Sequence, residues 1–269
     1  MSKSIHHGDP LARLSGVRLA KAGHSVLDGV TLDVFAGELL AVVGPNGAGK
    51  SSALKCLGGI ETDWQGHIEL AGSALEGFAS AERARQIAYL PQIFAPHWEL
   101  SVADLLEIGL QRGRPTLGWR PWAGPRQTTA ELLAQRTRLL DDLELSGFLE
   151  RRFASLSGGE RARALLAQAL VTQPNLLLAD EPIASLDPAH QLRTMQYLRR
   201  CRDRTASVVV LHDLNLALRF ADRIAVMAHG RVVACGTTAH IVASDILAHV
   251  FDVRFEAHTT CWGEALLAS

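Results

Sequence analysis

The sequence predicts an α/β fold that is interrupted by one helical insertion. Short apolar runs of the kind that parallel sheets bury recur at 39–43, 87–90, 176–179 and 207–211. The first run leads into a glycine-rich loop and then a helical pattern at 51–57, which is a strand–loop–helix unit. After Gln92 the pattern changes: apolar residues recur at helical spacing at 101–111, and a polar-rich helix is expected at 127–143, so we interpret roughly 93–157 as the insertion.

The N-terminal third predicts further strands around that unit. Residues 17–34 are interpreted as strands about a turn, because apolar and polar residues alternate from Val30 to Val34. The first helix is expected to end at Gly58-Gly59, and a short strand is expected at 67–70.

Within the insertion we expect helices at 101–111 and 127–143, separated by a loop at 113–126 that holds three prolines and two tryptophans. The α/β pattern then resumes. We expect further helices at 162–170, 188–204 and 214–221 and a hairpin of strands at 224–227 and 231–235.

Composition excludes several classes of function. With 27 Lys and Arg against 28 Asp and Glu, the chain has no basic excess, so nucleic acid is not expected as a partner. No apolar run reaches membrane-spanning length, and residues 1–10 lack a secretory signal pattern. The four cysteines are far apart, which favours reduced thiols over a disulfide or zinc framework.

The glycine-rich loop is a candidate phosphate-binding site. It fits the pattern G-x-x-x-x-G-K-S and, with the next serine, comprises Gly44, Pro45, Asn46, Gly47, Ala48, Gly49, Lys50, Ser51 and Ser52. Glycines let backbone N–H groups curl around an anion, and the helix start adds partial positive charge. Lys50 can reach terminal phosphates and the Ser51 hydroxyl can bind Mg²⁺. The alternative is a glycine-rich turn without a ligand.

Two adjacent carboxylates follow the apolar run at 176–179. We assign Asp180 to Mg²⁺ and Glu181 to polarising an attacking water, since neighbouring residues at a strand end point to opposite sides. Pro182 is expected to keep Glu181 extended. The alternative is that both are solvated charges at a strand end.

Ser157, Gly158 and Gly159 precede Glu160 at the start of a predicted helix. The ordinary interpretation is a capping box, because S-x-x-E satisfies the first N–H groups of a helix. The functional interpretation is a second anion site, because two glycines are poor helix formers but allow a ligand to approach closely.

Taken in order, these motifs resemble those of the ATP-binding cassette ATPases, across roughly residues 14–255. They are GPNGAGKS, LPQ ending at Gln92, LSGGE, LLLADEP, Ser185-Leu186-Asp187 and His212. The resemblance implies a P-loop NTPase (RecA-like) core, an antiparallel β subdomain and an α-helical subdomain. It also implies an ATPase domain at 12–256, with a core at 1–92 and 158–240, helices at 93–157, and a tail at 241–269.

The resemblance also assigns roles. Gln92 would sense Mg²⁺ and contact a transmembrane partner, and His212 would hold the γ-phosphate and the water. Ser157, Gly158 and Gly159 would bind ATP held by a second copy, and Asp187 would lie at the dimer contact. Asp187 is equally an ordinary helix N-cap.

Two positions depart from the family pattern. An aromatic residue often stacks on adenine in this family, but residues 14–34 contain no Tyr, Phe or Trp, and Lys21 stands near that place. We therefore expect weak discrimination between ATP and GTP, within about tenfold. The LSGGE segment at 156–160, which we call the signature segment, ends in Glu160, where Gln is commoner in this family.

The segment HDLN at 212–215 and the tail FDV at 251–253 resemble the ATPases of metal-chelate importers, which carry iron-siderophores, haem or cobalamin. Such a subunit would bind ATP and Mg²⁺ at the cytoplasmic face of the inner membrane. Its partners would be permease subunits and, indirectly, a substrate-binding protein. The alternatives are an ATPase of another importer or exporter, a soluble cassette ATPase, or a non-catalytic cassette.

Overall fold

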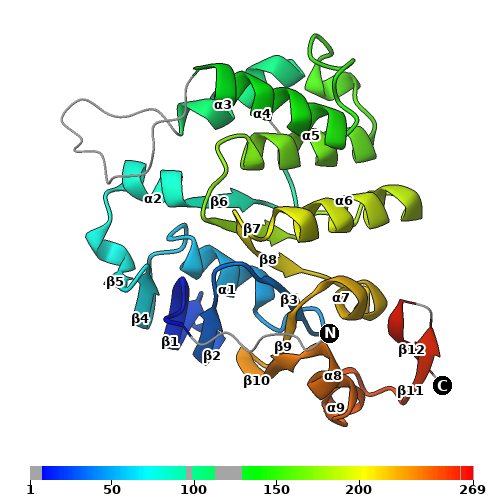
Figure 1. Cartoon of the computed structure of the whole chain (residues 1–269). Helices are drawn as coiled ribbons and strands as arrows, with labels where there is room; N and C mark the ends of the chain where they lie inside the picture. The colour runs from blue at the N-terminus through cyan, green and yellow to red at the C-terminus, as the bar shows by residue number, and fades with distance from the viewer. Residues whose placement is uncertain (1–7, 95–98, 113–128, 261, 269) are drawn as a thin grey trace.

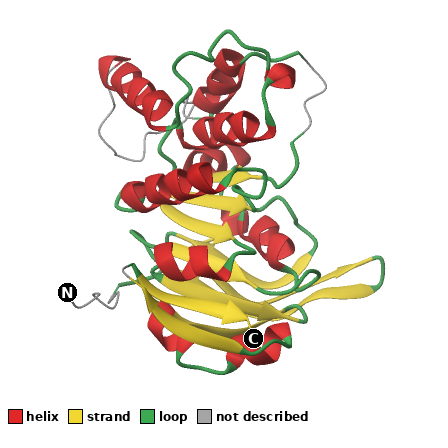
Figure 2. Ribbon diagram, turned by 90° about the vertical axis from the view of Figure 1, so that its right-hand side faces the viewer, coloured by secondary structure: helices red, strands yellow, loops and turns green. Residues whose placement is uncertain are grey.

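The computed structural model describes residues 8–94, 99–112, 129–260 and 262–268. A six-stranded sheet with the order β10-β9-β3-β8-β7-β6 runs through the middle of the molecule (Figures 1 and 2). Its strands are β3 (Leu39–Val43), β6 (Ile87–Leu90), β7 (Leu176–Asp180), β8 (Ala206–Val210), β9 (Arg223–Ala228) and β10 (Arg231–Thr237). Neighbouring strands are parallel except for β9 and β10, which form a hairpin.

A second sheet lies beside the first. It has the order β2-β1-β4-β5, and all of its pairs are antiparallel. Its strands are β1 (Ala12–Lys21), β2 (His24–Val34), β4 (Trp64–Leu70) and β5 (Ser73–Ala74). Helix α1 (Lys50–Leu57) packs between the two sheets, where Ala53, Leu54 and Leu57 are buried.

Helices α6 (Pro188–Cys201) and α7 (Leu214–Phe220) lie on the side of the six-stranded sheet away from α1, as Figure 1 shows. Helices α3 (Val102–Gln111), α4 (Thr129–Asp142) and α5 (Gly158–Leu170) are stacked beyond strand β6, and α8 (Thr238–Val242) and α9 (Ile246–Phe251) lie toward the β10 end. Helix α2 (Ser80–Gln86) precedes β6. Short 3-10 turns occur at Leu75–Gly77 and Phe153–Ser155. No helix in these described ranges is both long and apolar enough to cross a bilayer.

The six-stranded sheet separates two apolar cores. In β3, the side chains of Leu39, Ala41 and Val43 pack with the helical layer, whereas Leu40 and Val42 pack with α1 and the antiparallel sheet. This alternation follows from the two-residue period of a strand. Because both faces are covered, the central strands are apolar throughout, which is why the sequence runs showed no alternation.

Most predicted elements are confirmed within one to three residues. The expected strands at 87–90, 176–179 and 207–211 correspond to β6, β7 and β8, and the helix expected at 101–111 is α3. The expected loop at 113–126 lies outside the described residues, as does the start of the helix expected at 127–143.

The C-terminal residues, expected only to form a tail, are regular structure packed on the rest of the chain. Helices α8 and α9 bury Ile241 and Leu247 in the helical core. Strands β11 (Phe255–Thr260) and β12 (Gly263–Ala268) then form a separate antiparallel hairpin. In Figure 1 this hairpin lies beside α7.

Candidate nucleotide site

The predicted phosphate loop lies between β3 and α1, and three glycines give it its shape. Gly44, Gly47 and Gly49 all have positive φ, at 150°, 80° and 94°. Gly49 is the N-cap of α1 and makes no side-chain cap hydrogen bond, and the first turn of α1 carries no acidic residue. The first N–H groups of α1 are therefore left for an external anion.

Two of these glycines are also required by packing. A Cβ at Gly44 would lie 2.1 Å from the carbonyl oxygen of Met227, and a Cβ at Gly49 would lie 2.8 Å from that of Val26. Gly47 has open space around it, so only its left-handed backbone favours glycine. The loop is thus held against β2 and β9 as well as curled for a ligand.

Lys50 folds back across this loop. Its Nζ donates hydrogen bonds to the carbonyl oxygens of Gly44, at 2.7 Å, and Pro45, at 2.9 Å. Burial lowers the pKa of this ammonium, while the nearby carboxylates Glu181 and Asp180 act in the opposite direction. The cation is therefore buried inside the loop, where a phosphate would compete with neutral carbonyl groups for it.

Asp180 is buried at the end of β7 and contacts the start of α1. Its Oδ1 accepts a hydrogen bond from Ser51 Oγ at 2.9 Å, and its Oδ2 accepts one from the Tyr89 hydroxyl at 3.4 Å. Burial, followed by the charge of Asp180, raises the pKa of Tyr89, so this phenol remains a donor. Sequence analysis missed Tyr89, although it is the polar member of an apolar strand that pairs with β7.

A hydroxyl beside a carboxylate is a donor set that fits Mg²⁺. This ion commonly takes one or two protein oxygens and completes its shell with water and phosphate. No group of three or more His, Cys, Asp or Glu that could hold a metal occurs among the described residues. Ser51 and Asp180 would therefore hold Mg²⁺ together with a nucleotide rather than alone.

Glu181 is held between two other predicted site residues. Gln92 Nε2 donates to its Oε2 at 2.7 Å, and His212 Nε2 lies 2.5 Å from its Oε1. These side chains come from the ends of three neighbouring parallel strands, β6, β7 and β8. Ligands of open α/β sheets bind at this carboxyl edge.

The expected extended backbone at Glu181 is wrong. Its φ is 53°, in the left-handed region that non-glycine residues seldom adopt. Pro182 disfavours only the right-handed helical region for the preceding residue, which leaves this alternative open. Such conformations persist where the surroundings enforce them, and here Gln92 and His212 hold the side chain from both sides.

The capping box predicted for the signature segment is confirmed. Ser157 Oγ accepts from Glu160 N at 3.2 Å, and Ser157 N donates to Glu160 Oε2 at 2.7 Å. This backbone hydrogen bond lowers the pKa of Glu160. The two glycines also lie close to residues that follow β7. A Cβ at Gly159 would lie 3.3 Å from Leu186 Cδ2, and a Cβ at Gly158 would lie 3.7 Å from Ser185 Cβ.

This segment is not hydrogen-bonded to the phosphate loop of the same chain: within the described residues, no hydrogen bond joins Ser157 or Gly159 to residues 44–52. Gly158 instead borders a small pocket of about 230 Å³ that Gln92 and Glu181 also line.

Asp187 is the N-cap of α6, which confirms the interpretation of this residue as an ordinary helix cap. Its Oδ1 accepts from His190 N at 2.9 Å, and this bond lowers the pKa of the carboxyl group. Near the expected adenine position, Lys21 forms an ion pair with Glu61.

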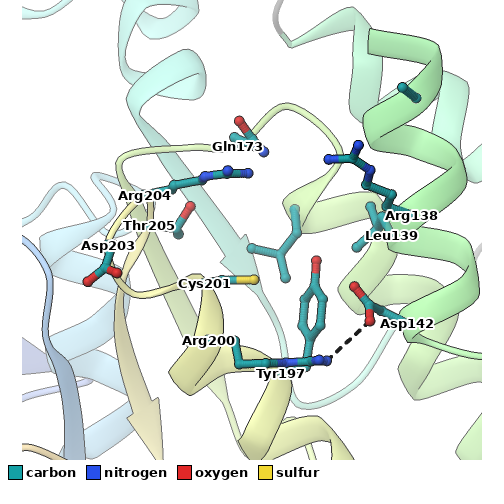
Figure 3. A pocket seen from close by; sticks show the side chains of 12 residues that line it. Arg138, Leu139, Asp142, Gln173, Tyr197, Arg200, Cys201, Asp203, Arg204 and Thr205 are labelled. Atoms are coloured by element: carbon teal, nitrogen blue, oxygen red, sulfur yellow. Dashed lines mark hydrogen bonds and ion pairs between the residues drawn. The ribbon is translucent and has the colours of Figure 1, made fainter. Parts of the chain in front are cut away.

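A larger pocket of about 670 Å³ lies elsewhere, between α4 and the C-terminal end of α6 (Figure 3). In Figure 3, Arg138, Tyr197 and Arg204 point into it. None of the predicted site residues lines this pocket, so size alone does not locate the site.

Comparison with known proteins places the chain in a family. The family model described as ABC transporter matches residues 27–184. The chain is 39% identical over 253 residues to the hemin import ATP-binding protein HmuV of Streptomyces coelicolor, covering 93% of this chain and 86% of that protein.

A second relative is the cobalamin import ATP-binding protein BtuD of Halobacterium salinarum, which is 36% identical over 91% of this chain and 60% of that protein. Among solved structures, an ATP-binding subunit of an ABC transporter superposes with a TM-score of 0.74 at 26% identity, covering 90% of this chain and 93% of that chain. The chain therefore belongs to the ATP-binding cassette family and is an ATP-hydrolysing subunit of an ABC transporter.

Proposed function

We propose that this chain drives the uptake of a metal chelate of the haem or cobalamin class, from the cytoplasmic face of the inner membrane. The carrying observation is the cluster of Gln92, Glu181 and His212, which lies at the carboxyl edge of the sheet, where the phosphate loop also begins after β3. The cargo class is supported by the import functions for which the two relatives are named.

In this proposal the phosphate loop binds ATP. Backbone N–H groups of residues 44–52 and the uncapped start of α1 surround the phosphates. Lys50 exchanges its carbonyl partners for β- and γ-phosphate oxygens, which are stronger acceptors. Ser51 and Asp180, together with Gln92, would hold Mg²⁺, and the ion would supply positive charge to neutralise the phosphates.

Glu181 polarises the attacking water. Its two carboxylate oxygens already engage Gln92 and His212, so the three side chains form one hydrogen-bonded unit. Arrival of the γ-phosphate would draw His212 toward a phosphate oxygen and free one Glu181 oxygen to accept a proton from water.

The active unit is a dimer in this proposal. One chain encloses the nucleotide from one side only, and its own signature segment is not bonded to its phosphate loop. The exposed donors of Ser157, Gly158 and Gly159 suit the γ-phosphate held by a second copy, with Asp187 at the contact.

The division into subdomains is also proposed here. Residues 93–157 form the helical subdomain of a domain at 12–256, between core segments 1–92 and 158–240, with a C-terminal segment at 241–269. Together with Gln92, this subdomain contacts the permease subunits, through which a substrate-binding protein acts indirectly. Substitutions on the exposed side of α3, such as Ile108→Asp, should impair transport but leave basal hydrolysis nearly unchanged.

The decisive test uses Glu181→Gln, which keeps the side-chain shape but removes the negative charge. This variant should bind ATP, hydrolyse it at least about a hundredfold more slowly, and accumulate as a dimer with MgATP. The measurement is size-exclusion chromatography with light scattering, with and without MgATP.

The matched control adds Ser157→Arg to Glu181→Gln, which should bind ATP yet remain monomeric because the new side chain blocks the γ-phosphate face. A Glu181→Gln protein that hydrolyses ATP at the wild-type rate would contradict the catalytic assignment. The cargo is tested by purifying the membrane proteins that associate with this chain and measuring haemin- and cobalamin-dependent ATPase activity in vesicles.

A further inference from the structure

The C-terminal hairpin contacts the element that follows His212. Strands β11 and β12 pair with each other, and Leu266 is the one buried residue of the described hairpin. Leu266 joins the helical core, and the hairpin lies against α7 (Figure 1). Nothing in the proposed reaction uses this hairpin, although α7 begins two residues after His212.

Asn215 joins α7 to the hairpin by two hydrogen bonds. Its Nδ2 donates to the carbonyl oxygen of Leu266 at 3.1 Å, and the backbone N–H of Leu266 donates to its Oδ1 at 2.7 Å. A carboxamide carries a donor and an acceptor side by side, as a peptide group does. Asn215 therefore pairs with β12 as a neighbouring strand would, and no other side chain of this length offers both groups.

A second contact lies one helical turn further along. The guanidinium of Arg219 stands over the Trp262 ring at 5.2 Å. Residues four apart share one face of a helix, so Asn215 and Arg219 present a single face of α7 to the hairpin. The hairpin thus fixes both the first turn and the end of a short helix.

The first turn of α7 is also attached to the catalytic cluster. Asp213 caps the helix, and its Oδ1 accepts from the N–H groups of Asn215, at 2.8 Å, and Leu216, at 3.0 Å. The preceding residue is His212, whose ring contacts Glu181. A continuous series of contacts therefore runs from Leu266 through Asn215 and Asp213 to His212.

We propose that Asn215 is a positioning residue for ATP hydrolysis and that the hairpin at 255–268 acts on His212 through it. This inference rests on the role proposed for His212. When the hairpin is docked, the two hydrogen bonds to Asn215 hold the first turn of α7 in one orientation, and with it the backbone that carries His212. Without them the first turn of the short helix is held only by its cap and by the burial of Leu216 and Ala217, and His212 meets Glu181 in a smaller fraction of molecules.

The phosphate loop does not depend on this contact. Ala48 of this loop and the helix that follows it pack in the core on the opposite side of the six-stranded sheet, and the loop binds through its own backbone and Lys50. The inference therefore separates two kinetic quantities. Loss of the hairpin contact should lower kcat and leave the KM for ATP unchanged.

The test compares full-length Asn215→Ala, Asn215→Asp and wild type by steady-state ATPase kinetics. Asn215→Ala loses both bonds to Leu266 and should lower kcat about tenfold, with KM within about twofold of wild type. Asn215→Asp still accepts from the Leu266 N–H but cannot donate to its carbonyl oxygen, so its kcat should lie between the two. Thr259→Ala alters the hairpin away from α7 and is the matched control, with unchanged kcat.

A chain ending at residue 254 gives the second arm. It should lower kcat at least as much as Asn215→Ala does, because it also removes the Arg219–Trp262 contact. Adding Asn215→Ala to it should cause no further loss, because the two bonds of Asn215 to Leu266 are already absent. Because the chain has five tryptophans, the fluorescence that Trp262→Phe removes from each full-length protein is taken as the signal of Trp262, and it reports release of the hairpin.

Several outcomes would overturn the inference. These are a kcat within twofold of wild type in Asn215→Ala with the hairpin released, a parallel loss of ATP affinity, or additive losses in the double variant. If Asn215→Ala does not fold, an Asn215→Asp protein with wild-type kcat overturns it equally. Failure of the proposed function is distinguishable, because Glu181→Gln would then hydrolyse ATP normally.

Discussion

Helices α1 and α5 both begin at glycines in segments that resemble phosphate-binding motifs, but their first turns are satisfied differently. The start of α1 has Gly49 as N-cap, with no side-chain hydrogen bond and no acidic residue. The start of α5 has Ser157 as N-cap and Glu160 in a reciprocal capping box. At an uncapped start the first N–H groups of the helix remain available to a ligand, whereas at a capped start some of them already donate to a side chain.

The difference indicates that the two helix starts bind an anion in different ways. At α1 an anion supplies the missing acceptor, so binding and local stability increase together. At α5 the helix is stable without a ligand, and Glu160 places a carboxylate near its start, where Arg151 contacts it at 3.2 Å. A phosphate at α5 therefore adds to an already complete cap and should be bound more weakly than at α1.

The largest effect is expected from Gly49→Ala. The new Cβ would lie 2.8 Å from the Val26 carbonyl oxygen, at a φ of 94°, so the loop must move. We expect a loss of about 2–4 kcal/mol in unfolding free energy, together with loss of ATP binding. Thermal denaturation and nucleotide titration measure both.

Gly159→Ala is the matched substitution at α5. Its Cβ would meet the flexible end of Leu186 at 3.3 Å, and alanine favours a helix. Its unfolding free energy should stay within about 1 kcal/mol of wild type. Equal destabilisation by both substitutions would mean that the two helix starts are equally constrained, contrary to the comparison.

Lys50→Ala should remove the cation from the uncapped site. We expect ATP affinity to fall about a hundredfold, or roughly 2.7 kcal/mol, because a charge-assisted phosphate contact is lost. Lys55→Ala, in the last turn of the same helix, is the control and should bind ATP normally. Binding is measured with a fluorescent nucleotide, and wild-type affinity in Lys50→Ala would remove Lys50 from the site.

Ser157→Ala tests the capped helix. Loss of the cap should cost about 1 kcal/mol of stability in the absence of nucleotide, because the N–H of Glu160 loses its acceptor. Urea unfolding of wild type and variant measures this difference. An unchanged unfolding free energy would mean that the capping box does not contribute to stability.

The smallest effect is expected from Glu160→Gln, which keeps an oxygen acceptor for the Ser157 N–H. In wild type the folded pKa of Glu160 lies below its ordinary value of 4.5. Its contribution to stability is therefore fully present above that value and is lost as pH falls through the lower folded pKa. The variant should match wild type at pH 7 within a few tenths of a kcal/mol and lose less stability below about pH 4.5.

Acid titration of unfolding free energy for the two proteins checks this. A variant that loses as much stability in acid as wild type would show that the charge of Glu160 contributes nothing to its cap.

The elements that could be predicted from the sequence are those with a local signal, such as a continuous apolar run or a helical repeat of apolar residues. Strands β6, β7 and β8 were expected because buried parallel strands are apolar on both faces. The cluster of Gln92, Glu181 and His212 could be expected only from the order of motifs, since the residues lie up to 120 positions apart and meet through strand order.

What was missed depends on contacts between distant segments. The hairpin at 255–268 has one buried residue among its described positions, and it is held by Asn215, which is 51 positions from Leu266. The left-handed backbone of Glu181 was missed because a local rule about proline excludes one region without choosing among the rest. Tyr89 was passed over because its polar tip is visible only once β6 and β7 are paired.

The six-stranded sheet separates two apolar cores, and this affects whether the stability effects of two substitutions add. Ala41 and Val42 are chain neighbours, yet their side chains belong to different cores. Their substitutions should therefore be nearly additive, whereas Val42 and Met227, in the same core, should be coupled. Substitutions confined to the helical core should therefore leave the packing of the core beside the phosphate loop largely unchanged.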